Sequence, residues 1–117
     1  MTFVFPQEIE VWYILPALRK ELAIAMKKHG LKQNEISKKL GVTAPAVSQY
    51  LRNKRANIIF FNKKIKKEIF NSATRIINEQ CLFLEIRRLC EIIRKEKVLC
   101  AIHKKYCNIK GRCYACV

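Results

Sequence analysis

The sequence predicts an all-α fold of five or six helices. Apolar side chains recur at steps of three and four residues along most of the chain, the spacing that places them on one face of a helix. The 117 residues include only 3 Gly and 3 Pro, so few positions interrupt a helix. Half of the residues are apolar, which is enough for the core of one domain, alone or with an appendage.

The first helix is expected from about Pro6 to His29, with a bend at Pro16 because proline lacks a backbone N–H. Gly30 follows and ends the helix. We expect Trp12 to pack in the core or in a dimer contact. The apolar stripe of this helix comprises Trp12, Leu15, Leu18, Leu22, Ala25 and Met26.

Two short helices joined by a tight turn are expected next, between Gln33 and Arg52. Ile36 and Leu40 are four residues apart, on one face of the first of these helices. Gly41 can adopt the left-handed conformation that ends this helix, and Val42 fills the corner.

The second short helix is predicted to begin after Thr43, whose hydroxyl can accept a backbone N–H. Val47, Tyr50 and Leu51 point to the core. A helix with a small, polar and uncharged-to-basic outer face has the shape that enters the major groove of DNA. The residues left for this outer face are Ala44, Pro45, Ser48, Gln49 and Arg52.

From Gln33 to Arg52, the sequence QNEISKKLGVTAPAVSQYLR resembles the helix-turn-helix of the Cro/C1 repressor (Xre-type) DNA-binding family. The resemblance implies a lambda-repressor-like domain that binds double-stranded DNA as a homodimer. Lys32 departs from the family, which often has a Ser or Thr cap there, and Ser37 stands where Ala is commonest. The pattern also occurs in ordinary antiparallel helix pairs. Here the cap, the glycine and the proline all agree with the apolar spacing, which favours the DNA-binding interpretation.

The resemblance also implies which residues contact DNA. Gln33 is placed to touch phosphate or a base, Gln49 can form two hydrogen bonds with adenine, and Ser48 can bond either base type. Ala44 and Pro45 can contact a thymine methyl group. The full set of expected DNA contacts is Gln33, Thr43, Ala44, Pro45, Ser48, Gln49, Arg52, Asn53, Lys54 and Arg55.

The charge of the chain agrees with a nucleic-acid partner. Lys and Arg number 24 against 9 Asp and Glu, a formal net charge of +15. The basic residues are spread over Lys27 to Lys67 and Arg87 to Arg112, which suits a folded basic surface better than a disordered arm. A polyanionic partner is therefore expected, with DNA as the first candidate.

Other classes of protein find little support in the sequence. The longest apolar run, Val11 to Leu18, is too short to span a membrane, and no secretion signal is visible. We therefore expect a cytoplasmic protein. We expect no enzyme activity, because no paired carboxylates, Ser-His-Asp set or phosphate-binding glycine loop is present.

Two further helices are expected, from about Asn62 to Glu79 and from about Leu82 to Lys95. The stripe of the second, with its steps of four, three and four, is typical of a core face or of half a dimer seam. The chain is therefore divided into a helix-turn-helix domain (1–60), a helical dimerisation or linking region (61–98) and a cysteine-rich segment (99–117). The two apolar stripes are Ile65, Ile69, Ala73, Ile76 and Ile77, then Leu82, Ile86, Leu89 and Ile93.

All six cysteines lie after residue 80. Structural disulfides are rare in the cytoplasm, so a metal site is the first explanation. Cys113-Tyr-Ala-Cys116 allows two thiolates to bind one metal ion or cluster. Cys81 is expected to be a small buried apolar residue.

Past residue 60 the chain also resembles a group of largely archaeal regulators with a C-terminal cysteine cluster. This resemblance implies four ligands, Cys90, Cys100, Cys113 and Cys116, and leaves Cys107 without a clear place. Four thiolates suit an iron–sulfur cluster, [4Fe–4S] in particular. A zinc site formed with His103 in place of Cys90 is the alternative, and a metal-free thiol switch is a third.

These observations together predict a sequence-specific transcriptional regulator that senses redox, iron or sulfur status through a C-terminal iron–sulfur cluster. One alternative is a helix-turn-helix regulator with a purely structural zinc site. Another is a non-regulatory sulfur- or metal-handling protein with a basic nucleic-acid-binding surface.

Overall fold

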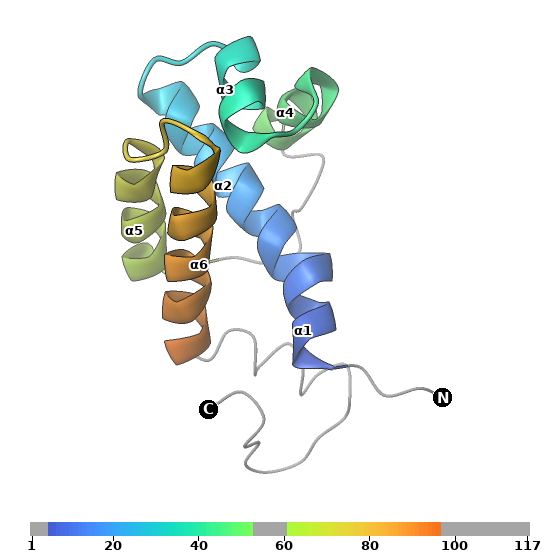
Figure 1. The fold of residues 1–117 in the computed structure, drawn as a ribbon, viewed down its shortest axis with the longest axis vertical. Coiled ribbons are helices and arrows are strands. Elements are labelled where there is room, and N and C mark those ends of the chain that lie inside the picture. Colours follow the sequence, from blue (N-terminus) through green and yellow to red (C-terminus); the bar gives the residue numbers. More distant parts are fainter. Residues whose placement is uncertain (1–4, 53–60, 97–117) are drawn as a thin grey trace.

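The computed structural model describes residues 5–52 and 61–96, and every regular element within them is helical (Figure 1). The all-α prediction is confirmed for these residues. None of the helices in these ranges is long and apolar enough to cross a membrane. The elements are α1 (Pro6–Ile9), the π-helix η1 (Glu10–Ile14), α2 (Leu15–Lys28), α3 (Gln33–Leu40), α4 (Ala44–Leu51), α5 (Lys63–Ala73) and α6 (Glu79–Lys95).

The first three elements follow one another directly and form the predicted N-terminal helix. Pro16 lies in the first turn of α2, immediately after η1. A π-helix forms hydrogen bonds between residues five apart instead of four, which changes which side chains share a face. Ile9 and Ile14, five residues apart, are fully buried. Trp12 is 53% exposed, so its expected place in the core stripe was wrong. A dimer contact for Trp12 stays a prediction.

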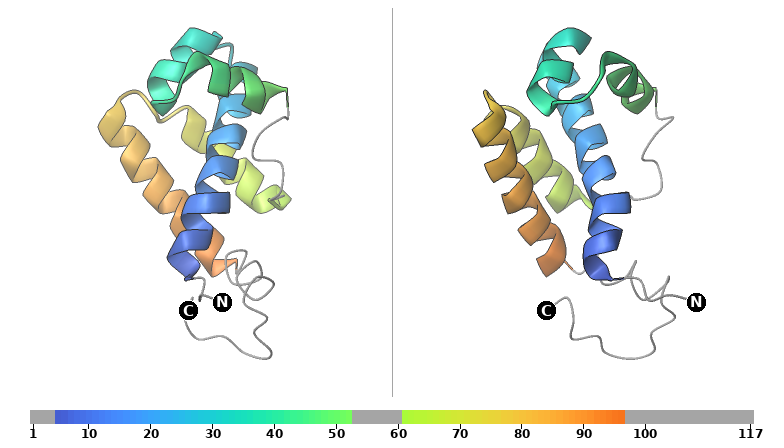
Figure 2. Two further views of the ribbon diagram at one scale, coloured as in Figure 1. Left: turned by 90° about the vertical axis from the view of Figure 1, so that its right-hand side faces the viewer. Right: turned by 45° about the vertical axis from the view of Figure 1, so that its right-hand side comes forward.

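The centre of the fold is α2, which packs against α3, α4 and α5 (Figure 2). Leu18, Leu22 and Met26 on α2 are fully buried in one continuous hydrophobic core. Burying each of these side chains contributes about 1.5–3 kcal/mol. The helix-turn-helix and α5 are therefore held by the same central element, and α6 packs against α5 and α3.

The boundary between the last two helices differs from the prediction. α5 ends at Ala73, well before Glu79, and α6 begins at Glu79. The start of α6 is set by Asn78, whose side-chain oxygen accepts the Cys81 N–H at 2.8 Å and caps this helix. Between the helices Ile76 is fully buried, whereas Ile77 is 70% exposed and does not belong to the apolar stripe.

The regular stripe of α6 packs inside the chain. Leu89 and Ile93 are buried in the core, and Leu82 and Ile86 are partly buried against it. The core alternative therefore holds for Leu89 and Ile93, and a dimer seam at Leu82 and Ile86 stays a prediction. The predicted domain boundary at residue 60 lies outside the described residues.

Candidate nucleic-acid interface

The turn between α3 and α4 has the geometry that the sequence predicted. Gly41 adopts a left-handed conformation, with φ 65° and ψ 33°, and ends α3. The Val42 N–H donates to the Ser37 carbonyl at 3.2 Å, and the Ser37 hydroxyl donates to the Val42 carbonyl. Ser37 stands where Ala is commonest in the family, and its side-chain hydrogen bond stabilises the turn. Sequence reasoning missed this role.

Each of the two helices begins with a specific hydrogen bond. The Glu35 carboxylate accepts the Lys32 backbone N–H at 3.1 Å, so α3 is capped although residue 32 is a lysine. The Thr43 hydroxyl oxygen accepts the Ala46 N–H at 3.2 Å, as predicted for α4. Pro45 lies in the first turn of α4, where a backbone N–H is not required.

The inner face of α4 is anchored in the core. Val47 is fully buried, Tyr50 is 4% exposed and Leu51 is half-buried. Ala46 is also buried, which the sequence analysis did not predict. This anchoring fixes the direction in which the opposite face of α4 points.

The outer face of α4 lies at the surface. Gln49 is exposed and Ser48 is partly exposed, so neither is packed inside the protein. Gln33, at the start of α3, is also exposed. The structure therefore presents all the described members of the expected contact set, Gln33, Thr43, Ala44, Pro45, Ser48, Gln49 and Arg52. Asn53, Lys54 and Arg55 lie outside the described residues.

The charged residues of the α3–α4 segment lie outside α4. α4 itself contains no charged residue, and Arg52 follows it directly. Lys38 and Lys39 lie in the last turn of α3, and Glu35 is the one acidic residue of that helix. This arrangement suits a helix that meets base edges while Arg52, directly after it, faces a phosphate.

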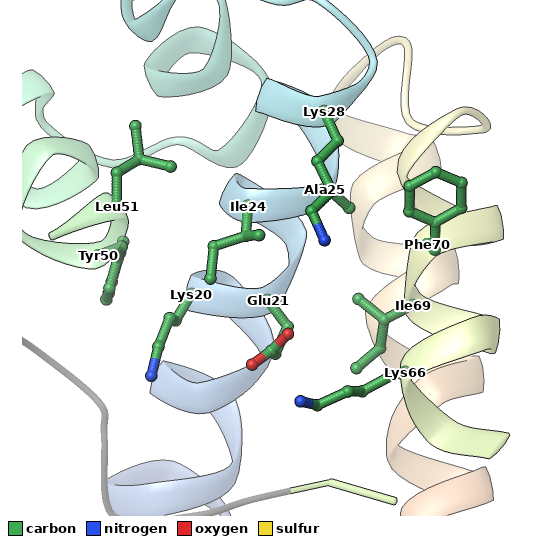
Figure 3. Close-up of a pocket in the computed structure, with 10 residues that line it drawn as sticks. All are labelled: Lys20, Glu21, Ile24, Ala25, Lys28, Tyr50, Leu51, Lys66, Ile69 and Phe70. Carbon is green, nitrogen blue, oxygen red and sulfur yellow. The ribbon is translucent and has the colours of Figure 1, made fainter. Parts of the chain in front are cut away.

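A pocket of about 310 Å³ lies beside this segment, between α2, α4 and α5 (Figure 3). Three of the lining side chains are lysines, Lys20, Lys28 and Lys66, and Glu21 partly offsets their charge. Within residues 5–52 and 61–96, none of the expected DNA contacts lines the pocket. Its lysines add to the positive potential near the end of α4.

Of the four expected metal ligands, the structure describes only Cys90, which lies on α6 and is partly buried. Burial and, to a smaller extent, the charge of Glu10 raise the pKa of this thiol to about 11, although the charge of Arg94 opposes them. A protonated thiol must lose its proton before it binds a metal.

The other candidate ligands cannot be placed beside Cys90. Cys81 is half-buried on α6 and is not among the side chains that pack against the core, so the buried apolar role expected of it was wrong. Cys100, Cys107, Cys113, Cys116 and His103 lie outside the described residues. Within residues 5–52 and 61–96, no group of three or more His, Cys, Asp or Glu could hold a metal ion.

Comparison with known proteins supports the assignment of the α3–α4 segment. A family model described as helix-turn-helix matches residues 22–58, which include the end of α2 and all of α3 and α4. No curated protein and no solved structure matches the chain. The match supports a helix-turn-helix of the Xre-like type in this segment, and it supports a DNA-binding regulator.

Proposed function

We propose that this protein is a sequence-specific transcriptional regulator that places α4 in the major groove of double-stranded DNA. The main observation behind the proposal is that α4 has one buried face and one exposed face. Val47 and Tyr50 fix one face in the core, while Ala44 and Gln49 leave the other face small, neutral and exposed. The helix-turn-helix match over residues 22–58 supports the same conclusion.

In this proposal the residues of α4 divide into readers and positioning groups. The Gln49 amide pairs with adenine, Ser48 bonds a neighbouring base, and Pro45 contacts a thymine methyl group. Gln33 and Arg52 bind phosphates and set the register. A homodimer presents two copies of α4 to successive major grooves, about 34 Å apart.

The test is selection of a binding site from random duplex DNA, followed by affinity measurements. Gln49→Ala is expected to lose about 1–3 kcal/mol of discrimination at one base pair and to relax the preference there. Asn71→Ala is the control, because Asn71 is an exposed amide on α5, away from the contact set. Failure to enrich any sequence, or full specificity in the Gln49→Ala protein, would contradict the proposal.

We further propose that the C-terminal cysteines bind an iron–sulfur cluster, [4Fe–4S] in the first instance, and that its state controls DNA binding. The proposal is supported by the confinement of all six cysteines to the region after residue 80 and by the Cys113-x-x-Cys116 pair. When bound, such a cluster supplies a redox-sensitive group. A structural zinc site is the alternative, and it predicts a colourless protein.

Metal and sulfide analysis after oxygen-free purification separates these two assignments. Iron with matching sulfide supports the cluster, whereas stoichiometric zinc without sulfide supports the structural site. Cys113→Ser is expected to lower cluster content and to change operator affinity. Equal operator affinity of the wild-type protein in both redox states would remove the sensor role and leave the DNA-binding proposal intact.

A further inference from the structure

A groove of about 800 Å³ lies between the start of α2, the end of α3 and the first half of α6. The start of α6 lies next to α3, where the Lys39 ammonium donates to the Ile76 carbonyl at 3.3 Å (Figure 1). Apolar side chains from all three helices and from the connection before α6 line the groove, namely Leu15, Leu40, Ile77, Leu82, Phe83 and Ile86.

Two of these apolar side chains are largely exposed to solvent, which is unfavourable for apolar groups. Ile77 is 70% exposed and Phe83 is 60% exposed, and both border on the half-buried Leu82 and Ile86. Single exposed apolar residues are ordinary, but several large ones around one groove mark a binding surface.

The charges around the groove indicate which kind of partner can bind there. Arg19, Lys38, Lys39 and Arg87 border it, against the single acid Glu79. A second copy of the chain brings the same basic rim and a net charge of +15. Residues 97–117 contain five Lys and Arg and no Asp or Glu, so this segment is repelled as well. An acidic occupant is attracted.

We propose that this groove binds an acidic amphipathic helix of a partner protein. The apolar side chains of such a helix, spaced at three and four residues, enter between Leu82 and Phe83, and its carboxylates meet the basic rim. None of the expected DNA contacts that the structure describes lines the groove. The surface is therefore separate from the outer face of α4, and this proposal stands independently of the DNA-binding one.

The test uses the full chain and two synthetic helical peptides that share an apolar stripe of Leu and Phe. One carries Glu at its polar positions and the other carries Lys. Fluorescence anisotropy is expected to show binding of the Glu peptide alone. The double substitution Ile77→Ser/Phe83→Ser is expected to raise its Kd by about tenfold or more. Leu84→Ser is the matched control, since Leu84 is 63% exposed on the same helix but does not line the groove.

A second pair of variants tests the charge argument without changing the apolar surface. Lys38→Gln is expected to weaken binding of the Glu peptide. Lys63→Gln, an exposed lysine of α5 outside the groove, is expected to have a smaller effect. Thermal unfolding followed by circular dichroism checks that each variant is folded.

Four results would overturn the proposal. The Glu peptide does not bind, or binds no tighter than the Lys peptide. Leu84→Ser weakens binding as much as the double substitution. Sedimentation shows self-association that the double substitution abolishes, which assigns the groove to a second copy. A peptide of residues 97–117 with Ser for Cys displaces the Glu peptide, which assigns the groove to the chain's own C-terminal segment.

Discussion

Single residues decide how sharply the chain turns between α3 and α4. Gly41 holds a positive φ of 65°, and a Cβ atom added there would meet nothing within 4 Å. Replacing Gly41 therefore has no steric cost against neighbouring groups, and the whole penalty lies in the backbone conformation. Ser37 adds a side-chain hydrogen bond across the same turn.

We expect Gly41→Ala to lower the free energy of unfolding by about 1–2 kcal/mol, because L-residues with a Cβ disfavour the left-handed region. Gly41→Asn is expected to cost less, since Asn adopts this region more readily, and Gly41→Val to cost more. Urea unfolding measures all three. An Asn variant no more stable than the Val variant would show that something other than φ controls the turn.

At the scale of elements, α5 and α6 are joined by polar contacts as well as by the core. The Arg88 guanidinium on α6 donates to Glu68 of α5 at 2.9 Å and to Glu85 at 3.3 Å. It also bonds the fully buried Ser72 hydroxyl of α5. At the other end of α6, Arg94 donates to the Glu10 carboxylate of η1 at 3.1 Å. These contacts orient α6 beside the groove that we propose for a partner helix.

The contact between Arg88 and Glu68 predicts a pH dependence. The hydrogen bond from Arg88 holds the pKa of Glu68 below its ordinary value. A lowered pKa stabilises the folded chain above the unfolded-state pKa, and this contribution is lost as pH falls through the folded-state pKa. Glu68→Gln is therefore expected to be less stable than wild type at about pH 7 and equally stable near about pH 2, when the carboxyl is protonated.

Urea unfolding at both pH values measures this difference. Glu91→Gln is the control, because the exposed Glu91 meets Arg87 at 3.8 Å within one helix and such pairs contribute little. A gap between wild type and Glu68→Gln that persists at low pH would contradict the assignment.

At the scale of the whole molecule, the net charge of +15 dominates any encounter with DNA. Cations that neutralise phosphates release counterions, so log affinity falls linearly with log salt concentration. The exposed Arg52, directly after α4, is placed to make one such contact in each protomer.

We expect operator affinity to fall by about a thousandfold or more between about 50 and 200 mM salt. Arg52→Gln is expected to reduce the slope of log affinity against log salt by about 1 per protomer. It is also expected to weaken binding to all DNA sequences alike. Lys95→Gln, at the end of α6 remote from α4 (Figure 1), is expected to leave the slope unchanged. Equal salt slopes for the wild-type protein and Arg52→Gln would show that Arg52 does not contact a phosphate.

The features that depend on local chemistry could be predicted from the order of the residues. The positive φ at Gly41, the Thr43 cap and the inward face at Val47 and Tyr50 are confirmed, because turns, caps and helical periodicity are set by residues a few positions apart. The same local rules failed at Asn78, where an N-cap inside an apolar pattern was overlooked. The DNA contacts of Ser48 and Gln49 stay predictions.

Only the tertiary structure decided what depends on contacts between distant segments. The exposure of Trp12 follows from the π-helix before Pro16, and the burial of Leu89 and Ile93 follows from packing against helices that are far away in sequence. The groove beside Ile77 and Phe83 is formed by three helices at once. Periodicity tells which face of a helix is apolar, but the partner that covers this face is set by how all the helices pack together.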